Sequence, residues 1–318
     1  MSADAEIAVA GEAVIDLVDD GDGERFRAVP GGSPANVAVA LARLGRPVRM
    51  LARLSDDTFG RRLRAHLARS GVDLSQCVTA AEPAALAVAS LDPAGRAAYD
   101  FYLDGAADWQ WSPDELIRPA PPVVAVHTGS LALSLPPGNL VLEDFLKHEH
   151  DRGQVTISID LNLRPSIVSD VVAERARVDR QIRHAHLVKA SDEDLAWLYP
   201  GRPIDEIAAG WRASGVACSV ITLGARGAYL LGPTGVAHHQ TARPIEVVDT
   251  VGAGDAFTGG MLAALASIGA LGADPNQRLA VVTPQQWLSV LDQASVVAAL
   301  TCMRRGADSP TREELAAF

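Results

Sequence analysis

The sequence predicts an α/β protein in which a central, mostly parallel sheet is covered by helices on both faces. Short apolar runs alternate with helical patterns along the chain, and buried strands between amphipathic helices are typical of such a sheet. The chain has 318 residues, 48% of them hydrophobic, which suffices for a large core. No sequence repeat and no low-complexity linker divides it, so we predict a single domain over residues 1–318.

The predicted strands and helices follow this alternation from the N-terminus. A strand at Glu6–Ala10 precedes a helix at Pro34–Leu44, and a second pair follows at Val48–Leu51 and Gly60–Ser70. Later apolar runs, each followed by a helix-like or loop segment, are expected to extend the sheet. These runs are Val123–Val126, Val155–Asp160, His186–Val188 and Val220–Thr222.

Two segments interrupt the alternation and predict a small second sheet. Ala13–Val29 and Ala84–Phe101 contain extended, alternating stretches around Asp, Gly and Pro turn residues. We expect short antiparallel strands inserted into the α/β body, which can cover a site as a lid. The lid is expected to be discontinuous, over about 12–31 and 84–110.

The C-terminal third contains the longest apolar stretch, around Met261–Ala273. This stretch falls short of the roughly 20 residues that span a bilayer, so we interpret it as a buried helix and expect no membrane contact. The following segment, Gly269–Pro284, is rich in turn residues and is expected to be a surface loop. A late helix is predicted at Gln285–Cys302.

Composition and charge exclude several classes of function. The formal charge of −11 argues against non-specific nucleic-acid binding, which needs a basic surface. The acidic N-terminus lacks the basic and apolar regions of a secretory signal. Three widely spaced cysteines match no metal site and are expected to be reduced thiols, as in a cytoplasmic protein. They are Cys77, Cys218 and Cys302.

The most informative motif is a glycine-rich turn that leads directly into an apolar helix at Ala256–Leu265. The backbone N–H groups of Gly252, Ala253 and Gly254 are expected to be free at the helix N-terminus, where the dipole favours an anion. Asp255 lies in the first turn, where it could take a proton from a hydroxyl while the amides hold negative charge. A carboxylate suits any helix N-terminus, but a cap does not need three small residues before it.

Two other nucleotide-binding motifs do not fit this segment. Gly252 and Gly254 superficially match a dinucleotide fingerprint, but that motif requires a second strand ending in an acidic residue about 20 positions later. An Ala-rich helix and a polar loop follow here instead. A Walker A loop is absent because the sequence contains no Gly-Lys dipeptide.

Residues 248–260 resemble the C-terminal signature of the PfkB family of ribokinase-like sugar kinases. Residues 31–45 resemble the N-terminal signature of the same family, in the expected order, so the resemblance covers essentially the whole chain. It implies a ribokinase-like α/β sandwich with a small β lid, ATP as phosphoryl donor and Mg²⁺ as metal. It also implies transfer to a sugar hydroxyl, with Asp255 as the base.

The N-terminal signature predicts a capped helix beside a ligand. We expect Ser33 to be the N-cap and Pro34 the first helical residue, and Gly45 to end the helix. The two glycines before Ser33 permit close backbone approach, and the amide of the early asparagine could bond sugar hydroxyls. The sugar-binding candidates of this segment are Gly31, Gly32 and Asn36.

Other sugar-site residues follow from the resemblance. Asp16 matches the aspartate that accepts hydrogen bonds from two sugar hydroxyls, although an acid in an apolar strand can also face solvent. Arg96, Tyr99 and Phe101 match the lid segment, with an ordinary exposed strand as the alternative. Arg164 lies in a segment similar to that of fructokinases and 2-keto-3-deoxygluconate kinases, where it could contact substrate or phosphate. Alternatively, it is a surface arginine before a proline.

On the nucleotide side, residues 189–194 resemble the element associated with the magnesium–phosphate network. The resemblance places Lys189 and Ser191 at the nucleotide and Asp194 at Mg²⁺, through a bridging water because the aspartate is short. Ser191 at the start of a helix with Asp194 three residues later is also a good capping pattern. Both readings remain open from the sequence.

The remaining cofactor residues also come from the resemblance. Thr222, Gly224 and Gly227 match the family's turn along the nucleotide phosphates. Asp249 and Gly306 match a monovalent-cation site beside the anion loop, which K⁺ could occupy. The eight histidines show no paired metal spacing.

The expected substrates are ATP and a small sugar. Fructose is the leading acceptor because the segments around Asp16, Tyr99, Arg164 and Lys189 are together most similar to fructokinases. The closest competitor is 2-keto-3-deoxygluconate, although no unambiguous extra cation is present to receive its carboxylate. A non-catalytic sugar- or nucleotide-binding regulator is the alternative from another class, and the intact segment around Asp255 argues against it. A homodimer is among the assemblies that the resemblance allows.

Overall fold

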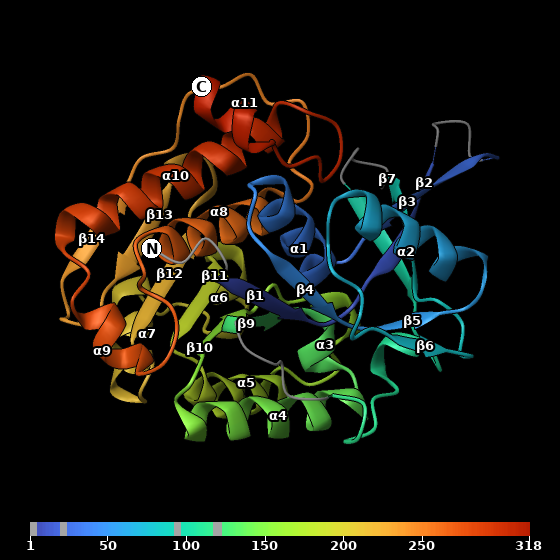
Figure 1. Ribbon diagram of the computed structural model, residues 1–318, viewed down its shortest axis with the longest axis horizontal. Helices are drawn as coiled ribbons and strands as arrows, with labels where there is room; N and C mark the ends of the chain where they lie inside the picture. Colours follow the sequence, from blue (N-terminus) through green and yellow to red (C-terminus); the bar gives the residue numbers. More distant parts are fainter. Residues whose placement is uncertain (1–4, 20–23, 92–96, 117–122) are drawn as a thin grey trace.

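The computed structural model describes residues 5–19, 24–91, 97–116 and 123–318 (Figure 1). Its central sheet has the strand order β14-β13-β12-β11-β10-β9-β1-β4, and every neighbouring pair from β4 to β12 is parallel. In chain order the strands are β1 (Glu6–Ala10), β4 (Val48–Leu51), β9 (Val123–Gly129), β10 (Thr156–Asp160), β11 (Leu187–Ser191), β12 (Cys218–Thr222), β13 (Ala228–Leu231) and β14 (Ala237–Gln240). The predicted mostly parallel sheet is confirmed, and an unpredicted antiparallel hairpin, β13–β14, forms one edge.

Helices cover both faces of this sheet, as Figure 1 shows. Successive residues of β1 point to opposite faces, so Ile7 and Val9 belong to one apolar core and Ala8 and Ala10 to the other. The first core is closed by α1 (Ser33–Arg43), α2 (Thr58–Arg69), α8 (Ala253–Ser267) and α10 (Pro284–Cys302). The second is closed by α4 (Gly138–Arg152), α5 (Val171–Gln181), α6 (Asp192–Leu198) and α7 (Ile204–Ala213).

Short elements complete the structure. They are α3 (Leu131–Ser134), α9 (Pro275–Ala280), α11 (Arg312–Ala317), the 3₁₀ helices η1 (Ala107–Trp109), η2 (Pro165–Ile167), η3 (Ile182–His184) and η4 (Gly224–Arg226), and the strand pair β5 (Arg53–Ser55) and β6 (Val78–Ala80). Within the described ranges, no helix has the length and apolar character that crossing a bilayer requires.

The apolar helix α8 is buried between α1 and α10, as the sequence predicts. A side chain on Gly259 would place its Cβ 2.7 Å from the Cβ of Ala40 on α1. One on Gly260 would lie 3.0 Å from the Cα of Ala294 on α10. These two glycines therefore let three helices approach at backbone distance, and this approach fixes where the N-terminus of α8 lies.

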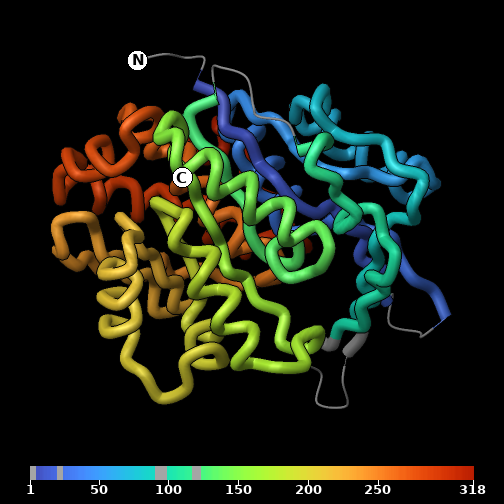
Figure 2. The backbone as a smooth tube through the Cα atoms, turned by 90° about the horizontal axis from the view of Figure 1, so that it is seen from below, coloured from blue at the N-terminus to red at the C-terminus, as the bar shows by residue number. Residues whose placement is uncertain are grey.

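A second sheet, here called the lid sheet, is built from both inserted segments. Its strands are β2 (Val14–Asp19), β3 (Phe26–Gly31), β7 (Leu86–Leu91) and β8 (Ala97–Tyr102), in the order β3-β2-β7-β8. The two predicted antiparallel hairpins are present, and an unpredicted parallel pairing of β2 with β7 joins them. Figures 1 and 2 show this sheet at one end of the molecule. The buried Asp108 ties it to the body by accepting a hydrogen bond from the N–H of Ala13 (3.0 Å).

Two local predictions are wrong. The segment Gly269–Pro284 is not simply a surface loop, because it contains α9 and buries Leu271 and Leu279 in the first core. Asp274 and the proline after it start this short helix. Ser33 is not the N-cap of α1, since Gly32 (φ 98°) takes that place without a side-chain hydrogen bond. The Ser33 hydroxyl has another partner, described below.

Candidate active site

The predicted anion-binding loop forms the start of α8. Gly252 is the N-cap in the left-handed region (φ 75°), and an added Cβ there would meet the Cβ of Ala307 at 2.4 Å. Within the part of the chain that the structure describes, the N–H groups of Gly252, Gly254 and Asp255 have no acceptor, so they are open to an anion. The prediction that Ala253 also has a free N–H is wrong, because this group donates to the carbonyl of Thr250 (3.2 Å).

The carboxylate of Asp255 is buried where the N-termini of α8 and α1 meet. Its Oδ1 accepts a hydrogen bond from the Ser33 hydroxyl (2.7 Å), and its Oδ2 accepts one from the Asn36 amide (2.8 Å). Burial raises the pKa of Asp255 to about 6, and the two hydrogen bonds partly oppose that rise. The group is therefore a carboxylate at neutral pH with an increased affinity for a proton.

Sequence reasoning missed Ser33 as a partner of Asp255. The signal was its spacing: Ser33 and Asn36 are three residues apart, which places both side chains on one helix face. A serine there can serve as a cap or as a donor to another element, and only the fold brings Asp255 within reach.

A buried ion pair lies beneath the anion-binding loop. Asp160 ends β10 and is the Cα partner of Lys189 in the neighbouring strand β11, and the lysine Nζ lies 2.6 Å from Asp160 Oδ2. The Thr258 hydroxyl donates to the same oxygen (3.2 Å). The Nζ also lies 3.5 Å from where a Cβ on Gly254 would be. The lysine therefore directs positive charge at the loop, and the loop glycine leaves room for a ligand to meet it.

Asp160 and Thr258 were not among the predicted site residues. Asp160 lies at the carboxyl end of an apolar strand, which is where ligands bind in parallel sheets, and that position was a usable signal. Its Oδ1 is buried and has no hydrogen-bond partner among the described residues. Thr258 gave no local signal, since it lies within an apolar helix.

The sugar-side candidates face this site from the lid sheet. Asp16 on β2 contacts Gly31 on β3, where an added Cβ would lie 2.2 Å from the carboxylate. Burial raises the pKa of Asp16 to about 6; Arg164 opposes this rise and Asp255 adds to it. These electrostatic interactions show that Asp16, Arg164 and Asp255 share one region.

The aromatic residues of β8 complete this side. Tyr99 stacks on Phe101, with ring centroids 6.0 Å apart. Burial, followed by the charge of Asp16, raises the pKa of Tyr99, so this ring belongs to the same region. Arg164 bonds its own segment through the backbone oxygens of Asn162 and Leu163. The predicted lid residue Arg96 lies outside the described residues.

The segment at residues 189–194 forms a capping box. Ser191 Oγ accepts the N–H of Asp194 (3.0 Å), while Asp194 Oδ2 accepts the N–H of Ser191 (2.8 Å). The other oxygen, Asp194 Oδ1, accepts the N–H of Leu163 (2.9 Å). The capping alternative is therefore confirmed, and the Mg²⁺ role of Asp194 stays a prediction.

The turn after β12 is a tight glycine turn, as predicted. Gly224 (φ 56°) and Gly227 (φ 98°) both adopt left-handed backbone conformations, and an added Cβ on Gly227 would lie 1.9 Å from the carbonyl oxygen of Gln240. Thr222 ends β12, and its hydroxyl donates to the carbonyl of Ala190 (3.4 Å). The turn thus lies beside the carboxyl end of β11.

The two residues predicted for a monovalent cation are in contact. Asp249 Oδ2 accepts the N–H of Gly306 (2.7 Å), and its Oδ1 accepts the N–H of Val251 (3.0 Å). The N–H of Asp249 itself donates to the carbonyl of Cys302, the last residue of α10 (3.1 Å). Asp249 therefore joins the anion-binding loop to the end of α10. No cluster of three or more His, Cys, Asp or Glu side chains suited to a metal occurs in the described ranges.

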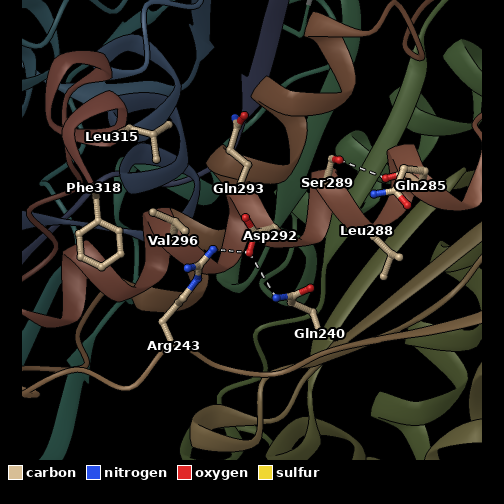
Figure 3. Close-up of a pocket in the computed structure, with 10 residues that line it drawn as sticks. All are labelled: Gln240, Arg243, Gln285, Leu288, Ser289, Asp292, Gln293, Val296, Leu315 and Phe318. Atoms are coloured by element: carbon tan, nitrogen blue, oxygen red, sulfur yellow. Dashed lines mark hydrogen bonds and ion pairs between the residues drawn. The ribbon is translucent and has the colours of Figure 1, made fainter.

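A cavity of about 570 Å³ lies between α10 and the chain that follows β14 (Figure 3). Asp292 on α10 pairs with Arg243 (2.7 Å) and accepts a hydrogen bond from Gln240 (3.3 Å). Residues 241–251 lead from this cavity to the anion-binding loop. No sequence pattern predicts this cavity, because its walls come from segments that are far apart in the chain. They are Gln240, Arg243, Gln285, Leu288, Ser289, Asp292, Gln293, Val296, Leu315 and Phe318.

Together these features define a class of enzyme. A buried carboxylate beside open backbone donors and a lysine can accept a proton from a hydroxyl while a phosphoryl group is held next to it. A second carboxylate, Asp16, and a tyrosine, Tyr99, lie on the lid sheet, and Arg164 lies in the segment that follows β10. The fold and the site therefore define a phosphotransferase that acts on a hydroxyl group.

The comparisons identify the family. Residues 4–314 match the pfkB family of carbohydrate kinases, and the chain belongs to this family. A fructokinase of Klebsiella pneumoniae is 35% identical over 268 residues, which cover 83% of this chain and 85% of that protein.

Two solved structures are similar over nearly the whole chain. Fructokinase from Xylella fastidiosa with bound ATP has a TM-score of 0.89 at 27% identity and covers 98% of this chain and 97% of its own. A double mutant of fructokinase from Vibrio cholerae O395, with fructose, ADP and potassium bound, has a TM-score of 0.86 at 28% identity, covering 99% and 98%. These similarities confirm the ribokinase-like fold and the carbohydrate kinase class.

Proposed function

We propose that this protein is an ATP-dependent kinase that phosphorylates fructose. The observation that carries this proposal is the buried Asp255 carboxylate, held by Ser33 and Asn36 beside the open N–H groups of the anion-binding loop. The names of the relatives support fructose as the acceptor, and the fructose bound in the Vibrio cholerae neighbour agrees with it.

In the proposed reaction Asp255 acts as the general base. The sugar hydroxyl lies between Asp255 and the γ-phosphorus of ATP, and Asp16 orients the sugar by accepting hydrogen bonds from its other hydroxyls. The hydroxyl oxygen forms a bond to the γ-phosphorus while the bond to the bridging oxygen breaks, and ADP leaves. The hydroxyl proton passes to Asp255. The N–H groups of Gly252 and Gly254, with Lys189, stabilise negative charge on the transferred group.

The local contacts of Asp255 suit this role. Ser33 and Asn36 occupy one lone pair on each carboxylate oxygen and fix the orientation of the group, which leaves other lone pairs for the substrate. Because burial raises its pKa to about 6, Asp255 is ionised at neutral pH and still takes a proton more readily than an exposed aspartate.

We propose the cavity beside α10 as the site of the adenosine part of ATP. Its apolar residues Leu288 and Val296 offer a surface for a base, and Gln240 and Gln293 offer hydrogen bonds. Val296 precedes the end of α10 at Cys302 by six residues, about 9 Å of helix. The phosphates can therefore extend from the cavity along the turn at Thr222 toward the anion-binding loop.

Two cations complete the proposal. The unpartnered, buried Asp160 Oδ1 and the nearby Asp194, whose pKa the Asp160 charge helps to raise, suit a hydrated Mg²⁺ held through water. When bound, Mg²⁺ neutralises charge on the triphosphate. Asp249 and the backbone at Gly306 would hold K⁺, in agreement with the potassium in the Vibrio cholerae neighbour.

Assembly and location are also proposals. Exposed aromatic side chains on the outer strands of the lid sheet, Phe26 on β3 and Tyr102 on β8, favour a homodimer formed through this sheet. Sedimentation velocity would detect it as a species of twice the chain mass. The free thiols of Cys77, Cys218 and Cys302 agree with a reducing compartment, the cytoplasm.

The acceptor is tested by ADP release over a panel of sugars with ATP and Mg²⁺. Fructose should give the highest kcat/KM. A tenfold or greater preference for 2-keto-3-deoxygluconate, about 1.4 kcal/mol in transition-state stabilisation, would reverse this assignment. Sugar or nucleotide binding with no turnover of any sugar would favour a regulator instead.

The same assay tests the cations. Removing Mg²⁺ with a chelator should abolish ADP release, because the charge on the triphosphate is then unbalanced. Replacing K⁺ with tetramethylammonium should lower kcat in the wild type. In Asp249→Ala, which lacks the proposed ligand, this replacement should have no effect. A wild type that is equally active in both salts would contradict the K⁺ site.

The adenosine site is tested by Val296→Trp. The larger side chain should fill the cavity and raise the KM for ATP at least tenfold, while the KM for fructose changes little. Leu140→Trp, on the exposed surface of α4, is the control and should change neither constant. An unchanged KM for ATP in Val296→Trp would exclude the cavity as the site of the adenosine part of ATP.

The role of Asp255 as the general base is tested by the substitution Asp255→Asn. This variant keeps the size of the side chain but cannot accept the proton, so kcat should fall by roughly 10²–10⁴-fold with little change in sugar or ATP affinity. The control Asp205→Asn, on the exposed face of α7, should retain kcat.

The pH profile gives a second readout. In the wild type, kcat/KM should fall as the pH drops below about 6, because Asp255 and Asp16 then become protonated. A folded Asp255→Asn protein with near-normal kcat would refute the mechanism.

A further inference from the structure

A second cavity lies on the opposite face of the central sheet from α8 and α10. It has a volume of about 310 Å³ and lies between α5, η3, the chain after α6, and α7. None of its lining residues belongs to the active site described above. They are Arg175, Asp179, Ile182, Arg183, Tyr199, Arg202, Ile207, Gly210, Trp211 and Ser214.

The floor of this cavity is aromatic and held in place by hydrogen bonds. Tyr199 and Trp211 are both buried, and their rings meet edge to face with centroids 6.4 Å apart. The Tyr199 hydroxyl donates to Asp179 (2.6 Å) and accepts a long hydrogen bond from the Trp211 indole (3.4 Å). The floor is therefore a preformed surface on which a small molecule can rest.

The walls carry an excess of positive charge. The guanidinium groups of Arg175 and Arg202 lie 5.4 and 5.8 Å from the centre of the Tyr199 ring. Arg183 is the third arginine, and Asp179 is the one carboxylate among the lining residues. Three positive charges and one negative charge leave two positive charges, in a protein whose formal net charge is −11.

These arginines are available to a ligand. Arg175 uses its Nε to bond the carbonyl of Leu198 (2.7 Å), and its terminal nitrogens have no hydrogen-bond partner among the described residues. Within the described part of the chain, Arg183 and Arg202 have no carboxylate at ion-pair distance. Two guanidinium groups beside one ring repel each other, and a bound anion would remove that repulsion.

We propose that this cavity binds a small phosphate monoester, such as a sugar phosphate. The dianionic phosphate would match the two excess positive charges, and guanidinium groups suit phosphate oxygens in bidentate geometry. The organic part rests on the Tyr199 and Trp211 floor. The volume is at the lower end of the usual range for ligand sites, which favours a phosphosugar over a whole nucleotide.

Isothermal titration calorimetry tests this site with glucose 6-phosphate, ribose 5-phosphate, inorganic phosphate and glucose as probes. The wild type should bind the two esters more tightly than inorganic phosphate, because only the esters contact the floor, and should not bind glucose in this cavity. The double variant Arg183→Gln/Arg202→Gln should bind the esters at least tenfold more weakly. Arg212→Gln, an exposed arginine of α7 outside the cavity, should bind them like the wild type.

Gly210→Leu provides an independent steric test. A Cβ at Gly210 would meet nothing within 4 Å, and leucine favours the helix more than glycine, so the variant should be folded and should block the cavity. Ester binding should be lost while kinase activity without added ester is unchanged. Ester binding that survives both variants, affinity for inorganic phosphate equal to that for the esters, or no ester binding by the wild type would overturn the proposal. Each result is independent of whether the protein phosphorylates fructose.

Discussion

The site depends on the contact between the N-termini of α1 and α8. Ser33 and Asn36 donate to a carboxylate more than 200 positions away in the sequence, at Asp255. Burying that charge is unfavourable, and these two hydrogen bonds offset part of the cost. The glycine at residue 259 permits the backbone approach that makes the bonds possible. The same contact thus fixes the position of this carboxylate and opposes the rise of its pKa that burial causes.

The parallel sheet contributes the second layer of the site. In a parallel sheet the carboxyl ends of neighbouring strands meet at one edge, so Asp160 and Lys189 become partners because of register alone. Their 2.6 Å contact pairs a buried lysine with a buried carboxylate beneath the loop. Removing either partner would leave the other charge buried and uncompensated, which is strongly destabilising. Through the Thr258 hydroxyl, which donates to Asp160, this pair also links the sheet to α8.

Much of this arrangement was predictable from the sequence, because the signals were local. Apolar runs between helical patterns predicted the parallel sheet, and three small residues before Asp255 predicted a glycine-rich turn at the start of α8. Two predictions failed, one because of a long-range contact and one because of a local turn. Ser33 has the pattern of a cap, yet its hydroxyl bonds another helix. The sequence pattern predicted a free N–H at Ala253, but in the folded chain this N–H donates to the carbonyl of Thr250. The cavity beside α10 joins segments that lie far apart in the sequence.

The lid sheet has a mechanical consequence. The parallel pairing of β2 with β7 fuses two hairpins into one body, and this body joins the rest of the chain at four crossings, at residues 11–13, 32, 81–85 and 103–106. Asp108, two residues after the last crossing, accepts a hydrogen bond from the N–H of Ala13 in the first. A sheet attached along one side can rotate about that side, but its translation and twisting are restricted. The lid sheet therefore has one permitted motion relative to the body, a rotation about this side, and it carries Asp16 and Tyr99 with it.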